Sequence, residues 1–316
     1  GDGDDADTLL RHAGGARQRV ADQGGNGVQS YTPQLGQRAQ ERAALERALY
    51  RALENDEFEL HYQPQLSLET GNVTGVEALL RWRHPELGLL GPGHFLEVAE
   101  DTGQIVPIGA WVLRTACAQA AAWHQAGHWP TVCVNISARQ MQLSMLGRTV
   151  QQALDACGLD PAYLELELTE RALVADGDLD ATIAVLRQLK QLGVCLALDN
   201  VGSGFTSLSY LTNFPIDVIK IDRSAVAAVP ERAGAASMVL AVIALARALG
   251  QKTVAAGVET LAQLDFLDRS GCDAMQGQYF SPPLPAAGLT SLLEQIGRDY
   301  RARLRDIAAS TRKRAG

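Results

Sequence analysis

The feature that most constrains the fold of this chain is a regular alternation of apolar, strand-like runs with amphipathic helical stretches, which begins at residue 58. Helical periodicity fills 106–126, 177–192 and 233–249. Strands that alternate with helices pair in parallel, and eight such units in about 240 residues predict a closed βα barrel. The eight strand-like runs are 58–66, 73–82, 131–137, 163–170, 194–200, 218–223, 253–259 and 274–280.

The first two strand-like runs depart from this alternation, because only a short turn around Thr70 and Gly71 separates them. A parallel connection needs a crossover of a dozen or more residues, whereas a short turn suits a hairpin. The first strand should therefore run antiparallel to the second. The expected fold class is α/β, a modified TIM (βα)8 barrel with an antiparallel first strand.

The barrel is predicted to occupy residues 56–297, with other segments on either side. Within 34–55, Leu45, Leu49 and Leu53 recur every four residues among Arg and Glu, which predicts an amphipathic linker helix. Residues 298–316 carry seven basic and two acidic side chains, which is typical of a solvated terminal helix or tail.

Charge, cysteine usage and hydropathy exclude several classes of protein. The net charge of −8 gives no general field for long nucleic acid. The five cysteines are scattered and form no CxxC pair, which indicates buried thiols in a reducing compartment. We find no apolar run of roughly 18 residues and no signal-peptide character, so no membrane segment is expected in this chain. The expected location is the cytoplasm, with the chain as part of a larger protein.

Five polar side chains interrupt strands that should otherwise be apolar. They are Glu77, Asn135, Glu167, Asp199 and Lys220. Burying such groups unpaired costs several kcal/mol each, so they must meet one another or a metal ion. The carboxyl ends of barrel strands lie on one face, which gathers these side chains into one site. Oxygen ligands without His or Cys favour Mg²⁺ or Mn²⁺, and these ions suit phosphate chemistry.

The motifs around these residues resemble, in order, the signature motifs of the EAL family. They are EALLRW at 77–82 with HPE at 84–86, VNIS at 134–137, ELTE at 167–170, KID at 220–222 and QG at 276–277. The match covers roughly residues 58 to 290. The resemblance implies a bacterial signalling protein with a modified TIM barrel and an antiparallel first strand. The activity that it implies is metal-dependent hydrolysis of cyclic-di-GMP to the linear dinucleotide pGpG.

The resemblance also implies roles for individual residues. Lys220 falls on the lysine that steadies the attacking water and the developing charge, and Glu170 on the glutamate that holds the loop after the aspartate of β-strand 194–200. Arg81 falls on an arginine that pairs with a ligand phosphate. The family's metal ligands fall on Glu77, Asn135, Glu167 and Asp199. Other residues expected near the nucleotide are Gln63, Leu79, Asp222, Gln276 and Pro283.

Two positions depart from the family pattern. Asn200 replaces the second acid of a double aspartate, and Ala256 stands where the AEGVE motif has its essential glutamate. The spacing of twenty residues from Ala256 to Gln276 supports this register, and Glu259 matches the motif's own second glutamate. Three carboxylates remain of five, which predicts one metal ion rather than two. Loss of a positioned base or ligand typically lowers the rate by roughly 10²- to 10⁴-fold.

Three functions remain open at this point. The first is a cyclic-di-GMP receptor whose catalysis is lost or strongly impaired, the second is a slow but genuine phosphodiesterase, and the third is an interaction module that no longer binds nucleotide. Residues 9–31 also resemble the end of a GGDEF domain, so residues 1–33 are interpreted as its remnant and a GGDEF-like domain is expected upstream in cis. The family resemblance further implies a homodimer.

Overall fold

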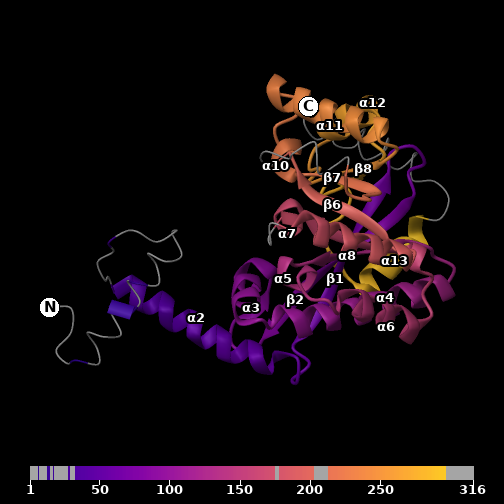
Figure 1. Ribbon diagram of the computed structural model, residues 1–316. Helices are drawn as coiled ribbons and strands as arrows, with labels where there is room; N and C mark the ends of the chain where they lie inside the picture. Colours follow the sequence, from indigo (N-terminus) through magenta and orange to yellow (C-terminus); the bar gives the residue numbers. More distant parts are fainter. Residues whose placement is uncertain are drawn as a thin grey trace.

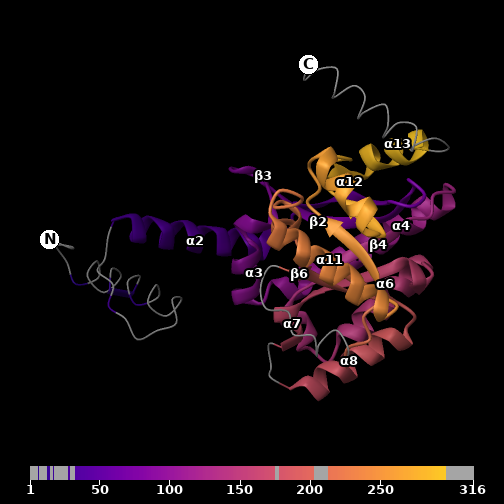
Figure 2. The ribbon, with the colours of Figure 1, turned by 90° about the horizontal axis from the view of Figure 1, so that it is seen from above.

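The computed structural model describes residues 33–174, 178–202 and 213–296, together with five isolated residues nearer the amino terminus. Most of the segment expected to be a GGDEF remnant, and the whole basic tail at 298–316, lie outside the described residues. Figures 1 and 2 show a barrel surrounded by helices, with one long helix at the amino-terminal side.

The strands form one closed sheet of the predicted kind. Around the barrel the order is β1-β9-β8-β7-β6-β5-β4-β2, and β1 pairs with β2 to close it. β1 is antiparallel to both of its barrel neighbours, whereas the pairings from β2 through β4 to β9 are parallel. The barrel strands are β1 (Phe58–Ser67), β2 (Val73–His84), β4 (Thr131–Ile136), β5 (Leu164–Thr169), β6 (Cys195–Val201), β7 (Val218–Ile221), β8 (Lys252–Ala256) and β9 (Ala274–Gln276). The predicted fold class and the antiparallel first strand are confirmed.

Helices surround the barrel, and one of them, α2, projects away from it. They are α2 (Pro33–Ala52), α3 (Leu96–Thr102), α4 (Ile105–Gln125), α5 (Ala138–Met141), α6 (Leu146–Cys157), α7 (Glu170–Val174), α8 (Leu179–Gln191), α10 (Arg223–Val226), α11 (Ala233–Ala248), α12 (Leu261–Ser270) and α13 (Ala286–Ile296), with 3₁₀ turns at Pro92–His94 and Pro161–Tyr163. Local sequence fixes several of their ends. In α12, Thr260 and Gln263 form a reciprocal capping box, and Gly271 ends the helix in the left-handed conformation.

Some strand limits differ from those expected. β8 ends at Ala256, three residues early, because Gly257 has a φ of 74° that takes the backbone out of the strand. β9 is also shorter than predicted, and two small strands were not predicted at all: β3 (Gly88–Leu90) pairs with β2, and β10 (Leu284–Pro285) pairs with β1.

The expectation of no membrane segment needs one correction. Helix α4 is 21 residues long and has a mean hydropathy of 1.3, so by length and composition it could cross a bilayer. In the fold, however, ten of its residues are buried, and Trp123 packs edge-on against Tyr62 of β1 with ring centroids 4.9 Å apart. The apolar composition of α4 therefore serves to cover the barrel wall. The five cysteines, all within the described ranges, are free thiols, and three of them are buried.

Helix α2 corresponds to the predicted linker helix and projects from the barrel beside α3 in both views (Figures 1 and 2). Leu49, near its carboxyl end, is only 1% exposed and belongs to the main hydrophobic core. Farther out, Arg42 forms ion pairs with Glu97 and Asp101 of α3. The helix is thus joined to the barrel by an apolar contact at one end and by exposed charges along its side.

Candidate functional site

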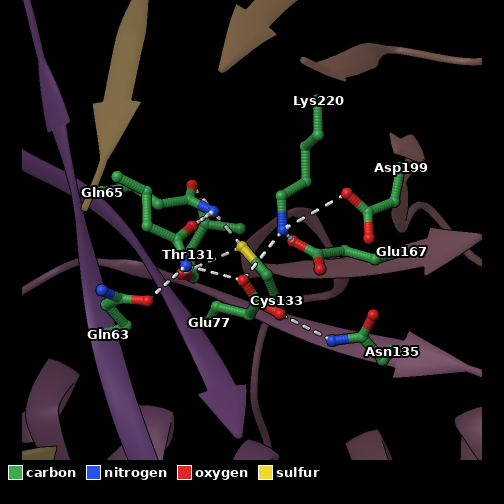
Figure 3. A network of polar contacts seen from close by, with 10 residues as sticks. Gln63, Gln65, Glu77, Thr131, Cys133, Asn135, Glu167, Asp199 and Lys220 are labelled. Carbon is green, nitrogen blue, oxygen red and sulfur yellow. Dashed lines mark hydrogen bonds and ion pairs between the residues drawn. The ribbon is translucent and has the colours of Figure 1, made fainter. Parts of the chain in front are cut away.

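The centre of the candidate site is Lys220, whose side chain is 2% exposed inside the barrel. Its Nζ lies 2.9 Å from Glu77 Oε2 and 2.6 Å from Glu167 Oε1. Asp199 is farther away, with Oδ1 4.0 Å from the same nitrogen. These four residues come from β7, β2, β5 and β6, and Figure 3 shows their side chains directed toward one another. Carboxylates from three distant strands therefore surround the ammonium of a fourth, which agrees with the prediction that these side chains share one site.

Amide side chains complete the hydrogen bonding around Glu77. Asn135 donates from Nδ2 to Glu77 Oε1 at 2.7 Å, and Gln276 donates from Nε2 to Oε2 at 2.7 Å. Gln276 also donates to Gln63 Oε1 at 3.0 Å and accepts from Gln65 Nε2 at 3.2 Å. A continuous polar network thus runs from β7 across the barrel to β1 (Figure 3).

Burial and charge act in opposite directions on these groups. Burial favours a raised pKa for Glu77, but the Lys220 ammonium and three hydrogen bonds outweigh it and lower the pKa. Burial, reinforced by repulsion from Glu77, raises the pKa of Glu167 well above its ordinary value. Burial likewise raises the pKa of Asp199. Burial opposes the charge on Lys220, yet the three surrounding carboxylates raise its pKa. The ammonium is therefore held charged as the counter-ion of the cluster.

The donor set at this face fits a hard divalent cation. The side chains available there offer only carboxylate and amide oxygens, the ligands that Mg²⁺ and Mn²⁺ prefer, from Glu77, Asn135, Glu167 and Asp199. Glu167 Oε2 is buried and has no hydrogen-bond partner among the described residues. An unsatisfied buried carboxylate oxygen is costly, and a cation would satisfy it.

The residues expected near the nucleotide lie around this cluster. Glu77, Leu79 and Arg81 follow one another on the same face of β2, since side chains alternate along a strand. Arg81 is partly buried, and no carboxylate of the described residues forms an ion pair with it; its Nη1 donates to Leu80 O at 2.9 Å. Burial lowers the pKa of this guanidinium.

The other expected contacts have mainly structural partners in this structure. Gln63 Nε2 donates to Ser281 O at 3.1 Å, next to the half-buried Pro283. Asp222 caps α10 by accepting from Ser224 N at 2.8 Å. Glu170 is the first residue of α7, and the loop that it is expected to hold falls largely at 203–212, outside the described residues. None of these observations assigns a role, so the roles remain predictions.

The two departing positions both lie at carboxyl ends of strands. Ala256 is the last residue of β8 and pairs directly with Gln276 of β9, which agrees with the twenty-residue register argument. Asn200 is exposed on β6 with a φ of 63°, a left-handed conformation that Asn tolerates better than most residues. Glu259 is exposed just before Thr260, the N-cap of α12.

Sequence reasoning did not place Gln65 or Glu165 below this cluster, and it predicted Cys133 only as a buried thiol without connecting it to the site. The signal was present in the strand period, because Glu165 and Glu167 are two residues apart on β5 and must share a face. Cys133 and Asn135 are likewise two residues apart on β4 and therefore share a face of that strand.

The structure is a closed βα barrel whose first strand runs antiparallel to its neighbours. Acidic, amide and lysine side chains cluster at the carboxyl ends of its strands. These two features define a class of TIM-like barrel proteins suited to metal and phosphate chemistry. The sequence profile of the EAL domain matches residues 46–283. The chain belongs to the EAL domain family.

Several relatives are named for cyclic-di-GMP chemistry. The chain is 42% identical over 307 residues to the cyclic di-GMP phosphodiesterase NbdA of Pseudomonas aeruginosa, covering 97% of this chain and 39% of the relative. It is 42% identical to the bifunctional diguanylate cyclase/cyclic di-GMP phosphodiesterase MucR of the same organism, covering 92% of this chain and 42% of the relative. The chain thus spans about two fifths of the length of these curated relatives. The solved c-di-GMP complex of the phosphodiesterase PaMucR has a TM-score of 0.74 and 44% identity, covering 78% of this chain and 99% of that one.

Proposed function

We propose that this chain is a cyclic-di-GMP-binding sensor or regulatory module of a GGDEF-EAL signalling protein, with its catalysis lost or strongly impaired. The observation that carries the proposal is Ala256, which places a methyl group at the end of β8, beside Gln276 and level with the polar cluster. Relatives named as phosphodiesterases and the PaMucR complex with c-di-GMP support the nature of the ligand.

The residues of this face have complementary tasks in binding. Arg81, without a carboxylate partner among the described residues, supplies a planar pair of donors to one phosphate. Gln63 and Gln276 are held together by a 3.0 Å hydrogen bond beside the site and keep the barrel wall polar where the nucleotide lies. Lys220 balances the carboxylates and supplies positive charge toward a phosphate oxygen.

Glu77, Asn135, Glu167 and Asp199 would hold one Mg²⁺ or Mn²⁺ ion. Such an ion polarises a phosphate oxygen as a Lewis acid, which suits binding as well as hydrolysis. A second ion lacks the carboxylates that positions 200 and 256 would provide. The chain therefore keeps the phosphate-binding part of the site and lacks part of the apparatus that activates water.

A second candidate function is a slow phosphodiesterase, and the intact Lys220–Glu77–Glu167 cluster favours it. Binding and hydrolysis should be measured on one preparation, by calorimetry with cyclic-di-GMP in millimolar Mg²⁺ or Ca²⁺ and by pGpG formation with Mg²⁺ or Mn²⁺ over long incubation. Binding without pGpG supports the receptor. Binding with measurable pGpG supports the slow enzyme, and absence of binding leaves the interaction module.

The setting of the domain is part of the same proposal. MucR, which is named as a diguanylate cyclase as well as a phosphodiesterase, supports a GGDEF-like domain upstream in cis. We further propose a homodimer and a cytoplasmic location. The amphipathic helix α2 is the element through which ligand binding is transmitted to the upstream domain, because its carboxyl end is anchored in the barrel core.

A further inference from the structure

The interior of the barrel holds a second group of potential ligand atoms below the nucleotide face. Cys133, Glu165 and Glu167 each place one donor atom within 4.8 Å of the others. No other set of three His, Cys, Asp or Glu side chains in the described residues is gathered this closely. Gln65 Oε1 lies 3.8 Å from Cys133 Sγ, which adds a fourth donor within reach.

Two oxygens of this group have no hydrogen-bond partner among the described residues. Glu165 Oε1 and Glu167 Oε2 are both fully enclosed, and Glu165 as a whole is 6% exposed. Glu167 has Lys220 beside its other oxygen, but no described residue forms an ion pair with Glu165. The Lys220 ammonium attracts Glu165 without contacting it. The two carboxylates and the thiol at this spacing therefore share one distant counter-charge, and a cation would complete the arrangement.

Glu165 and Gln65 border a cavity of about 920 Å³ on the face opposite the nucleotide site. Thr131, Cys195 and Lys252 also line it, and each is the first residue of its strand, so the cavity lies at the amino-terminal mouth of the barrel. Gly75 keeps this region open, because a Cβ there would lie 2.6 Å from Gln65 Oε1. The cavity therefore extends from this mouth to Glu165 and Gln65, and Cys133 and Glu167 lie buried behind them.

The structure assigns to this chain a second metal site, suited to zinc rather than to Mg²⁺ or Ca²⁺, at Cys133, Glu165 and Glu167 inside the barrel. The sulfur ligand decides the metal. Thiolates favour Zn²⁺, whereas Mg²⁺ and Ca²⁺ take oxygen ligands. The oxygen-only donors at the nucleotide face and the mixed sulfur and oxygen donors below it thus select different ions, although Glu167 contributes to both.

The test is cobalt binding to the whole chain after removal of metals with a chelator. Co²⁺ replaces zinc, and its bond to a thiolate gives a charge-transfer band in the near ultraviolet. Millimolar Mg²⁺ is kept in the buffer to occupy the oxygen-only site. The site should bind one Co²⁺ per chain with this band, and Zn²⁺ should remove it. Absence of the band in the unmodified chain overturns the proposal.

Two matched variants locate the cobalt. Cys133→Ser should abolish the band, whereas Cys195→Ser, which alters a thiol in the lining of the same cavity, should keep it. A band that persists in Cys133→Ser, or that disappears only in Cys195→Ser, contradicts the assignment. Glu165→Gln preserves shape and should weaken Co²⁺ binding by at least about tenfold. If circular dichroism shows that Cys133→Ser does not fold, the Glu165→Gln variant decides the question. Unchanged Co²⁺ affinity in Glu165→Gln then overturns the proposed site. Cyclic-di-GMP is absent throughout, so failure here leaves the nucleotide proposal untouched.

Discussion

At the scale of single residues, Lys220 is the group on which the barrel interior depends. Its ammonium contacts two carboxylates directly, and a third lies 4.0 Å away. A buried ion pair adds little stability in itself, but removing one partner leaves the other charge uncompensated. The lysine that the family resemblance assigns to catalysis is thus also a structural counter-ion.

Replacing Lys220 with Met should lower the free energy of unfolding by about 3–5 kcal/mol at neutral pH. The loss should shrink as pH falls. The pKa of Glu77 is lowered in the folded protein, so its stabilising contribution is present above its unfolded value and is lost on acidification through the folded value. The Lys220→Met variant lacks the stabilising contribution of Glu77 at every pH. In this variant, acidification also protonates the buried carboxylates that have lost their counter-ion, which removes part of the cost of burying them.

Denaturant unfolding at pH 8 and at about pH 3.5, on either side of the unfolded glutamate pKa of about 4.3, measures this difference. Lys190→Met is the control, because Lys190 pairs with Asp217 at a partly exposed position where ion pairs contribute about 1 kcal/mol or less. An equal deficit for Lys220→Met at both pH values contradicts the expectation.

The two departing positions should account for lost turnover. We expect the double variant Ala256→Glu with Asn200→Asp to form pGpG at least about 10²-fold faster than the unmodified chain, because it restores two carboxylates at strand ends. Single-turnover kinetics with Mn²⁺ measures the gain. Asn72→Asp, a change of the same type in the β1–β2 turn, is the control. No gain in the double variant means that activity, if absent, was lost elsewhere.

The residues of the site were more predictable than their partners. A polar side chain inside an apolar run is visible in sequence, and this identified Glu77, Glu167 and Lys220. The hydrogen bond that joins Gln65 to Gln276 was not visible, because it connects residues 211 positions apart and neither side chain is charged. Sequence shows which groups need a partner, whereas the barrel closure decides which partner they meet.

At the scale of elements, every predicted barrel strand is present, and the three-residue β9 was predicted because apolar residues continue beyond it. β3 and β10, with three and two residues, are shorter than one full alternation and carry no periodic signal. The predicted end of β8 was wrong because Val258 is apolar and buried, although it lies beyond the turn at Gly257. Hydropathy reports burial, and burial continues where a strand has already ended.

Helix α2 provides a prediction at this scale. Leu49→Ala should lower the free energy of unfolding by about 2–5 kcal/mol, because it empties a fully buried position between the helix and the barrel. Arg42→Ala on the same helix removes only exposed ion pairs and should cost about 1 kcal/mol or less. Denaturant titration of both variants measures the difference. Equal effects mean that the core contact of Leu49 does not anchor the helix.

At the scale of the whole molecule, the barrel separates two chemistries along its axis. The carboxyl-terminal face has oxygen donors and Arg81, which suit a metal ion and a phosphate. The amino-terminal mouth has a cavity of about 920 Å³ that leads to Glu165. Gln65 donates a hydrogen bond to Gln276, and Gln276 donates one to Glu77. An ion at one end and a nucleotide at the other therefore contact the same network.

Ligand binding at the nucleotide face should be visible as a change in the stability of the whole chain. A ligand at about one hundred times its dissociation constant adds about 2.7 kcal/mol to the folded state. For a domain of this size that corresponds to a rise in Tm of roughly 5–10 °C. Cyclic-di-GMP with Mg²⁺ should produce this shift in a calorimetric scan of the unmodified chain.

Arg81 and Arg83 allow this shift to be traced to one side chain, since both lie on β2 and both are arginines. Arg81 has no carboxylate ion pair among the described residues, whereas Arg83 is exposed and pairs with Glu59. Arg81→Ala should therefore lose most of the rise in Tm at the same nucleotide concentration, and Arg83→Ala should retain it. If Arg81→Ala keeps the full rise, the phosphate is bound elsewhere. An equal loss in both variants would mean that the nucleotide responds only to net charge on β2, because the two substitutions change that charge by the same amount.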